Sequence, residues 1–387
     1  MRFIEKNKNK NTLINEIGIT DFYSVTGEEI HEVAVGPVHA GIIEPGHFRF
    51  QCNGENVLHL EISLGYQHRG IENNIKKGPN KKTLFYMESA AGDTSIGHSL
   101  AYSQGVEALR GDAVSLRTES IRGVMLELER LANHTGDLGA LANDVGYLPT
   151  ASYCGRIRGD FLNLSALICG NRFGRGMVFP GGVNFELDDS YCKKILINID
   201  KAYKDVENAV ELLWNTPSVV DRFENTGVLD SNTGYDLGIV GVAARASNID
   251  QDVRYDFPSG IYRMSQIPIS TYYTGDVLSR AFVRWLEIKR SVDFIKEQLS
   301  WLPQTTYNTQ GEKLKPEHLV VSLVEGWRGE ICHTIITDNK GNFADYKIVD
   351  PSFHNWIGLA MVMRGEQISN FPLCNKSFNL SYCGQDL

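Results

Sequence analysis

The sequence predicts an α+β fold that is mainly α-helical. We expect a central helical bundle with a small antiparallel β-sheet at the N-terminal end and a β-hairpin near the C-terminus. Apolar residues recur at helical spacing over residues 117–143 and in several later stretches, which indicates amphipathic helices. Short runs of alternating polarity, ended by Asn and Gly, lie before and after these stretches and are typical of strands joined by tight turns.

The N-terminal sheet is predicted from a hairpin pattern. Residues 47–52 alternate apolar with polar, Asn53-Gly54 offers a tight turn, and residues 57–62 return as a second strand. Asn-Gly suits a two-residue turn because both residues tolerate positive φ angles. Residues 33–35 are expected to add a third strand.

The helical body is predicted from periodicity. A long amphipathic helix over 117–143 carries a regular apolar stripe, formed by Ile121, Val124, Leu128, Leu131, Leu138 and Leu141. Further helices are expected at 94–109, 157–169, 191–214 and 275–302. A second hairpin is expected from residues 330–337 and 343–349, around Asn339-Lys340-Gly341.

The chain is expected to form one folded domain after a short lead-in. Residues 1–30 are rich in Lys, Asn and Glu and predict a loosely structured segment. Residues 31–387 then divide into a sheet at 31–66, a helical body at 70–302 and a C-terminal hairpin and tail at 320–387. The sequence shows no internal repeat and no low-complexity linker.

Composition limits the classes of function. The 387 residues are 42% hydrophobic and 22% charged, with a net charge of −9, so a nucleic-acid partner is not expected. No apolar run approaches the roughly 18–20 residues that span a bilayer. The polar start lacks the apolar core of a signal peptide. We therefore expect the protein in the cytoplasm, with any membrane association arising through partner subunits.

The seven cysteines form no C-x-x-C pair. An odd count in a cytoplasmic chain indicates reduced, mostly buried thiols rather than disulfides. Iron–sulfur ligation needs clustered thiolates, so the chain is expected to carry no cluster of its own.

Three Gly-punctuated polar stretches are the candidates for function. They are Gly36-Pro37-Val38-His39 through Arg49, Gly65-Tyr66-Gln67-His68-Arg69-Gly70-Ile71-Glu72, and Tyr86 through Ser99. Each also has a structural interpretation. His39 and His47 could be ordinary loop residues, His68-Arg69 could cap a helix, and Gly92 and Gly97 could mark close packing.

These motifs resemble the large subunits of energy-converting [NiFe]-hydrogenases and the 49-kDa-type subunit of complex I. The formate-hydrogenlyase type is the most similar branch, because of the run Glu44-Pro45-Gly46-His47-Phe48-Arg49-Phe50. The resemblance covers residues 30–387. It continues through Glu127-Leu128-Glu129-Arg130-Leu131-Ala132-Asn133-His134, Arg172-Phe173-Gly174-Arg175-Gly176, Arg328-Gly329-Glu330 and Asp350-Pro351-Ser352-Phe353. It implies a hydrogenase large-subunit-like fold.

The resemblance also shows what is missing. The family binds nickel and iron through two C-x-x-C pairs, because soft thiolates are needed there. In this chain the four ligand positions are occupied by Ala91, Thr94, Ser381 and Gly384, and Cys383 lies one position away. We therefore expect no metal ligands, no nickel–iron centre and no hydrogen-activating chemistry.

In complex I relatives the corresponding cavity binds a quinone beside the [4Fe–4S] cluster of a small partner subunit. The resemblance implies that His39 or His47 and Tyr86 act on a quinone, and that Asp93 and His98 relay protons. Capping and packing are the alternative roles of Asp93 and His98. Arg69, with His68, would lie near the partner's cluster.

Two departures follow the hydrogenase branch instead. Gly174 stands where complex I relatives have a histidine, and Phe179 precedes Pro180-Gly181-Gly182 where they have arginine. The expected function is a peripheral-arm electron-transfer subunit, an oxidoreductase component that couples a small iron–sulfur subunit to membrane-arm subunits. The alternative is a non-catalytic scaffold that transmits conformational change.

Overall fold

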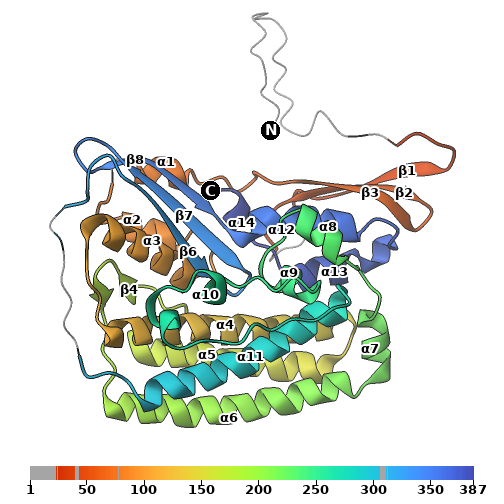
Figure 1. The fold of residues 1–387 in the computed structure, drawn as a ribbon. Helices are drawn as coiled ribbons and strands as arrows, with labels where there is room; N and C mark the ends of the chain where they lie inside the picture. Colours follow the sequence, from red (N-terminus) through yellow and green to blue (C-terminus); the bar gives the residue numbers. More distant parts are fainter. Residues whose placement is uncertain (1–22, 24, 40–42, 77, 306–310, 312) are drawn as a thin grey trace, which may run out of the picture.

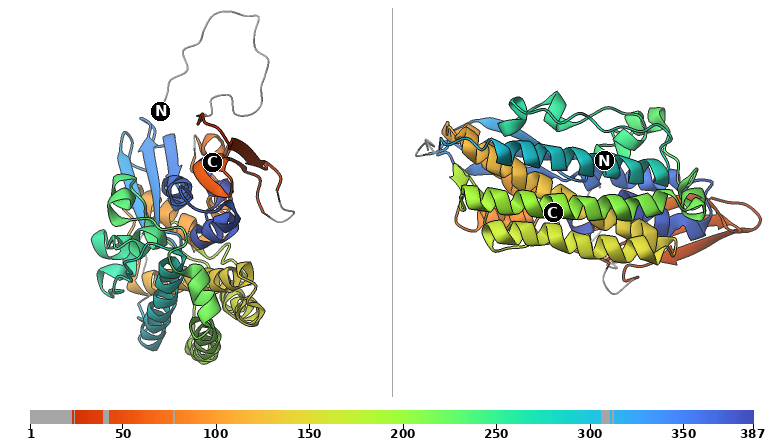
Figure 2. Two further views of the ribbon diagram at one scale, coloured as in Figure 1. Left: turned by 90° about the vertical axis from the view of Figure 1, so that its right-hand side faces the viewer. Right: turned by 90° about the horizontal axis from the view of Figure 1, so that it is seen from below.

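The computed structural model describes residues 23, 25–39, 43–76, 78–305, 311 and 313–387. Four long helices run side by side as a bundle, and two small sheets lie over it at opposite ends, with the C-terminal helices between them (Figures 1 and 2). The predicted lead-in at 1–30 lies mostly outside the described residues. The mainly helical architecture with small antiparallel sheets is confirmed.

The N-terminal sheet has three antiparallel strands in the order β1-β2-β3: β1 (Ile30–Val35), β2 (His47–Asn53) and β3 (Asn56–Ser63). The predicted turn at Asn53-Gly54 is displaced by one residue. Asn53 remains in β2 and pairs with Asn56, so the turn residues are Gly54 and Glu55. Gly54 supplies the positive φ of 55° that the first turn position requires.

The bundle consists of α4 (Leu116–Asp144), α5 (Leu148–Cys169), α6 (Asp189–Trp214) and α11 (Val277–Ser300). These helices confirm those predicted from the apolar periodicity, although α5 begins nine residues before the predicted start at 157. Pro149 stands in its first turn, where the missing amide proton costs nothing. Ser115, Asp188 and Asp276 cap α4, α6 and α11 by accepting hydrogen bonds from backbone amides.

The C-terminal sheet lies over α3 (Ser95–Arg110), which confirms the predicted helix at 94–109. Its strands are β6 (Leu319–Glu325), β7 (Glu330–Thr337) and β8 (Phe343–Val349), and β7–β8 is the predicted hairpin. Strand β6 was not predicted. It pairs with β7 through the short connection that contains Trp327 and Arg328.

The remaining elements are short and mostly lie between the sheets and the bundle. They are α1 (Ile71–Ile75), α2 (Thr83–Glu88), β4 (Val178–Phe179), β5 (Gly182–Val183), α7 (Pro217–Phe223), α8 (Ser231–Asp236), α9 (Gly241–Ala246), α10 (Val253–Asp256), α12 (Pro351–Val362), α13 (Phe371–Phe378) and α14 (Tyr382–Gln385), with 3-10 turns at Gly260–Arg263 and Ile368–Asn370.

Two large hydrophobic clusters form most of the core, and the second of them joins the two ends of the chain. The larger fills the bundle between α4, α5, α6 and α11. The second joins the N-terminal sheet to the C-terminal helices, where Phe48 and Phe50 of β2 pack with Trp356 of α12 and Phe378 of α13. This second cluster brings residues near position 40 beside residues near position 380. None of the helices in the described part of the chain is long and apolar enough to cross a membrane.

Candidate functional site

The two segments that have lost the cysteines lie against each other in the fold. Arg69 joins them, because its guanidinium donates to the carbonyl oxygens of Ala90 at 2.7 Å and Cys383 at 3.1 Å. Arg328 makes a second link: it donates to Asp93 at 2.6 Å and 2.8 Å and also to the carbonyl of Asn379. Both links are charge-assisted, which makes them stronger than neutral hydrogen bonds.

The four former ligand positions are engaged in packing and hydrogen bonds. The Thr94 hydroxyl accepts from the Trp327 indole at 3.1 Å, and the Ser381 hydroxyl accepts from the Gly384 amide at 2.9 Å. Gly384 packs so closely that a Cβ there would lie 2.8 Å from the Asp350 carboxyl carbon. Ala91 is fully buried and offers no donor atom. These side chains do not fit a soft, thiolate-demanding metal.

Cys383 does not replace the lost ligands. Its thiol lies 3.4 Å from the Ser381 hydroxyl, and burial raises its pKa, so the thiolate that a metal needs is disfavoured. Among the described residues, no group of three or more His, Cys, Asp or Glu side chains is arranged to hold a metal ion.

A cavity of about 880 Å³ opens beside these segments, between the N-terminal sheet, α4 and the C-terminal helices. Its apolar wall includes Val35, Ile43, Phe50, Phe371 and Leu380, and its polar wall includes His39, Glu44, Asp93, Asp144 and Arg328. A largely apolar pocket of this size with a few convergent polar groups is typical of a small-molecule site.

Asp93 and Arg328 form an ion pair in this wall, in which Arg328 is buried and Asp93 is partly exposed. Burial opposes the ionisation of Asp93, but the charge and hydrogen bonds of Arg328 outweigh it and lower the pKa of the carboxyl group. Arg328 also lies over the Trp327 ring, 3.9 Å from its centroid, so the cation is held in place from two sides. The cavity therefore contains a fixed carboxylate and a fixed guanidinium.

His39 is the second predicted residue in the cavity wall. Burial lowers the pKa of its imidazole, so the neutral form is favoured near pH 7. Its Nε2 atom is buried and has no hydrogen-bond partner among the described residues. The structure thus brings together His39 and Asp93, which lie 54 positions apart in the sequence (93 − 39).

His47 and Tyr86 lie outside the residues that line the cavity. His47 begins β2, and its Nδ1 atom lies 3.4 Å from the carbonyl oxygen of Gly36. Tyr86 belongs to α2 and packs against a separate hydrophobic cluster that includes Met87 and Tyr102. Of the histidine and tyrosine candidates, only His39 therefore contributes to the cavity wall.

His98 lies behind the cavity in a buried chain of hydrogen bonds. Its Nε2 atom is 3.1 Å from Asp350, its Nδ1 atom is 3.0 Å from His333, and His333 is 2.8 Å from the Tyr346 hydroxyl. Burial lowers the pKa of His333 and keeps it neutral, whereas the contacts of Asp350 with His98 and the charge of Arg328 outweigh burial and bring the pKa of Asp350 to about 2. His333, Tyr346 and Asp350 were not predicted as site residues.

Arg69 and His68 lie at the surface beside the former metal position. The His68 side chain is 55% exposed and its Nδ1 atom lies 2.9 Å from Asp386. Arg69 is also exposed, although its guanidinium reaches inward to the carbonyls that join the two segments. A partner docked on this face would therefore meet a cation within reach of the cavity segments.

Sequence reasoning missed Arg328, Tyr382 and Asp144 in the cavity. Arg328 belongs to the motif Arg328-Gly329-Glu330, and Tyr382 lies between the vacated positions Ser381 and Gly384. Asp144 ends α4; burial raises its pKa, and Lys376 opposes that rise. An aromatic residue between two lost ligand positions was the available signal for Tyr382.

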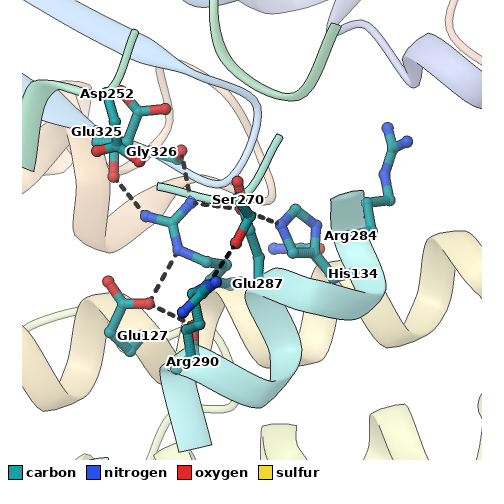
Figure 3. A network of polar contacts seen from close by, with 12 residues as sticks. Glu127, His134, Asp252, Ser270, Arg284, Glu287, Arg290, Glu325 and Gly326 are labelled. Carbon is teal, nitrogen blue, oxygen red and sulfur yellow. Dashed lines mark hydrogen bonds and ion pairs between the residues drawn. The ribbon is translucent and has the colours of Figure 1, made fainter. Parts of the chain in front are cut away.

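A buried ionic network lies on the other side of Trp327. Figure 3 shows Glu127, Asp252, Glu287 and Glu325 converging between α4, α11 and the end of β6. The cations paired with these four carboxylates are Arg130, Arg245 and Arg254, and His134 donates to Glu287 at 2.7 Å. Arg130 also donates to the carbonyls of Glu325 and Gly326, so the network fixes the β6–β7 connection that positions Arg328.

Glu129 gives the stability of the chain a defined pH dependence. Burial raises its pKa to about 8, although the amides of Ile96 and Gly97 donate to its carboxyl group and oppose the rise. Its contribution to stability is complete below the unfolded pKa of 4.5 and is lost as pH rises toward 8.

We expect Glu129→Gln to remove that dependence. Between pH 5 and 8 the free energy of unfolding of the wild type should fall relative to the variant, by up to about 4 kcal/mol. Urea unfolding at a series of pH values measures this difference. Parallel curves for the two proteins would contradict the assignment.

Comparison with known proteins agrees with the motifs and the fold. Residues 144–318 match the family model of the respiratory-chain NADH dehydrogenase 49 Kd subunit. The chain is 29% identical to the carbon monoxide-induced hydrogenase of Rhodospirillum rubrum, covering 90% of this chain and 97% of that protein. It is 30% identical to hydrogenase-4 component G of Escherichia coli, covering 94% of this chain but only 63% of the longer relative.

A solved structure shares the fold. A chain of the membrane-bound sulfane sulfur reductase, an archaeal respiratory membrane complex, superposes with a TM-score of 0.86 over 94% of this chain and 100% of that chain, at 20% identity. This likeness confirms the predicted fold. The chain is therefore a homologue of the large subunits of membrane-bound hydrogenases and of the 49-kDa subunit of respiratory complex I.

Proposed function

We propose that this chain is the peripheral-arm electron-transfer subunit of a membrane-bound oxidoreductase related to complex I and to the membrane-bound hydrogenases. The family match and the hydrogenase relatives support membership of such an assembly. The observation that carries the redox assignment is the cavity, which persists beside the former ligand positions with His39, Asp93 and Arg328 in its wall. A scaffold without a ligand would not need these polar groups to converge on one cavity, where Arg328 is buried and His39 and Asp93 are partly buried.

The proposed electron donor is a [4Fe–4S] cluster in a small partner subunit, because the seven cysteines of this chain form no C-x-x-C pair that would favour a cluster of its own. The exposed face around His68 and Arg69 is the proposed docking point. Arg69 contacts both segments of the former metal site, so an approaching cluster would lie near the cavity. A nearby cation favours the reduced, more negative cluster and would raise its potential.

The proposed acceptor is a quinone in the cavity. Reduction of a quinone to a quinol consumes two electrons and two protons: the electrons come from the partner's cluster, and the protons must be supplied within the site. His39 faces the cavity as a hydrogen-bonding group without a protein partner among the described residues. Arg328 would stabilise negative charge that develops on the acceptor, and Asp93 holds that cation in position.

The proposed proton relay is the chain from Asp350 through His98 and His333 to Tyr346. When both imidazoles are neutral, Tyr346 donates to His333, His333 donates to His98, and His98 donates to Asp350. With an additional proton on His98, His98 would instead donate to His333, and His333 would donate to Tyr346. Because the hydrogen bonds between His98, His333 and Tyr346 can be made in either direction, a proton can pass along them without movement of the side chains. Membrane-arm subunits are the proposed coupling partners, and they would hold this chain on the cytoplasmic side of the membrane.

Affinity purification from mildly solubilised membranes tests this assignment. A tagged copy of the full chain should co-purify with a small iron–sulfur subunit and with membrane-spanning subunits, identified by mass spectrometry. Arg69→Glu should weaken recovery of the small subunit, whereas Arg156→Glu, on the outer surface of α5, should not. Recovery of the tagged chain alone from wild-type membranes would contradict the proposal.

A further inference from the structure

Tyr382 and His39 face each other across one corner of the cavity. Their ring centroids are 6.1 Å apart, and both residues belong to the cavity wall. The Tyr382 ring is also packed edge-on against Trp356 at 4.9 Å and Phe48 at 6.2 Å. With a residue exposure of only 6%, Tyr382 has little freedom to turn away.

The backbone around Tyr382 is fixed as well. Its amide donates to the Glu44 carboxylate at 3.1 Å, and Glu44 lies in the same wall. On the other side, Gly46 approaches the ring so closely that a Cβ there would lie 2.6 Å from Tyr382 Cε1. The segments near positions 40 and 380 therefore place the phenol and the imidazole together.

The donor capacity of this pair is not used by the described residues, although the Asn375 amide is placed to donate to the Tyr382 oxygen. No group among the described residues accepts a hydrogen bond from the Tyr382 hydroxyl, and the Nε2 atom of His39 likewise has no partner there. Burial raises the pKa of Tyr382, and Asn375 opposes that rise, so the phenol keeps its proton near neutral pH. Buried polar groups normally use their hydrogen-bonding capacity, and two donors without an acceptor at one cavity corner indicate a ligand acceptor.

Tyr86, the tyrosine that the motif resemblance indicates, is placed differently. It packs on α2 with the cluster around Met87 and Tyr102, away from the residues that line the cavity. The structure therefore offers a phenol to the cavity from the opposite end of the chain.

We propose that Tyr382 and His39 donate hydrogen bonds to one carbonyl oxygen of a quinone-type head group in this cavity. This inference rests on the proposed function and assigns the donors of that site. For His39 it requires the tautomer with the proton on Nε2. Both donors would be stronger partners for the reduced, more negative oxygen than for the neutral carbonyl, and would therefore favour electron transfer.

The test uses the purified complex and two probes, a short-chain benzoquinone and a short-chain naphthoquinone. We expect Tyr382→Phe, which keeps the ring and removes the hydroxyl, to weaken binding or raise KM by about three- to tenfold, as for one lost hydrogen bond. Tyr102→Phe removes a buried phenol hydroxyl elsewhere and is the matched control. It should stay within about twofold of the wild type, as should Tyr86→Phe.

The outcomes separate the inference from the proposed function. If Tyr86→Phe impairs quinone binding and Tyr382→Phe does not, the donor assignment is wrong while the quinone site stands. If neither Tyr382→Phe nor His39→Leu changes binding of a quinone that the wild type binds, the donor pair is also wrong. If the wild-type complex binds and reduces neither quinone, the proposed function itself fails, and the donor assignment with it.

Discussion

Replacing Arg245 with methionine is expected to lower the free energy of unfolding by about 3–5 kcal/mol, or to prevent folding. The Arg245 guanidinium is fully buried and donates to Glu287 at 2.6 Å and to Glu325 at 2.8 Å. Methionine fills much of the same volume but leaves both carboxylates without their main cation. An uncompensated buried charge is among the largest single-residue penalties.

Urea denaturation of the purified chain measures this loss, and Arg156→Met is its control. Arg156 pairs with Asp160 and Asp205, but its side chain is 50% exposed, so its loss should cost less than about 1 kcal/mol. Equal small effects of the two substitutions would show that the buried network is not held by ion pairing. Adding Glu287→Gln to Arg245→Met should restore part of the lost free energy of unfolding, because it removes one of the two carboxylates left without Arg245.

Replacing Asp93 with asparagine is expected to lower the rate of quinone reduction by about 100-fold or more. The change keeps the shape of the side chain but removes the carboxylate that balances Arg328 in the cavity wall. Arg328 then keeps its contacts with Trp327 and the Asn379 carbonyl but loses its ionic partner, so the cation that should stabilise the developing negative charge is no longer held in the same position. Electron transfer into the complex should be unaffected, so the effect should appear in the acceptor half-reaction.

Asp345→Asn is the control for this substitution. Asp345 is 62% exposed, and its carboxylate lies 3.5 Å from the surface residue Lys76 and accepts a hydrogen bond from the Tyr346 amide. Its loss should leave turnover unchanged. Quinone reduction by the Asp93→Asn complex at the wild-type rate, with the subunits intact, would remove Asp93 and its ion pair from the mechanism.

The long elements were predictable because each repeats its pattern many times. Helix α4 carries its apolar stripe over 29 residues, so periodicity identified it almost to the residue. Strand β6 was not predicted because its exposed face also carries apolar residues. Leu319 and Val321 are 63% and 50% exposed, so the strand lacks the alternation of apolar and polar residues. Helix α2 has six residues, fewer than two turns, and short segments show no reliable period.

The site was predictable only in part, because tertiary packing decides it. Motif resemblance placed His39 and Asp93 in one site, and both line the cavity. It gave no reason to pair His39 with Tyr382, since that contact depends on the N-terminal sheet packing against the C-terminal helices. The buried network was invisible for the same reason: its members come from α4, α9, α10, α11 and β6.

The central claim is that electrons pass from a partner's iron–sulfur cluster to a quinone beside the vacated nickel position. The most direct measurement reduces the purified complex anaerobically with dithionite, removes the excess, adds a short-chain quinone, and follows the cluster by electron paramagnetic resonance. The account predicts that the cluster is reoxidised and that one quinol forms for every two electrons withdrawn. A cluster that stays reduced in the presence of the quinone would contradict it.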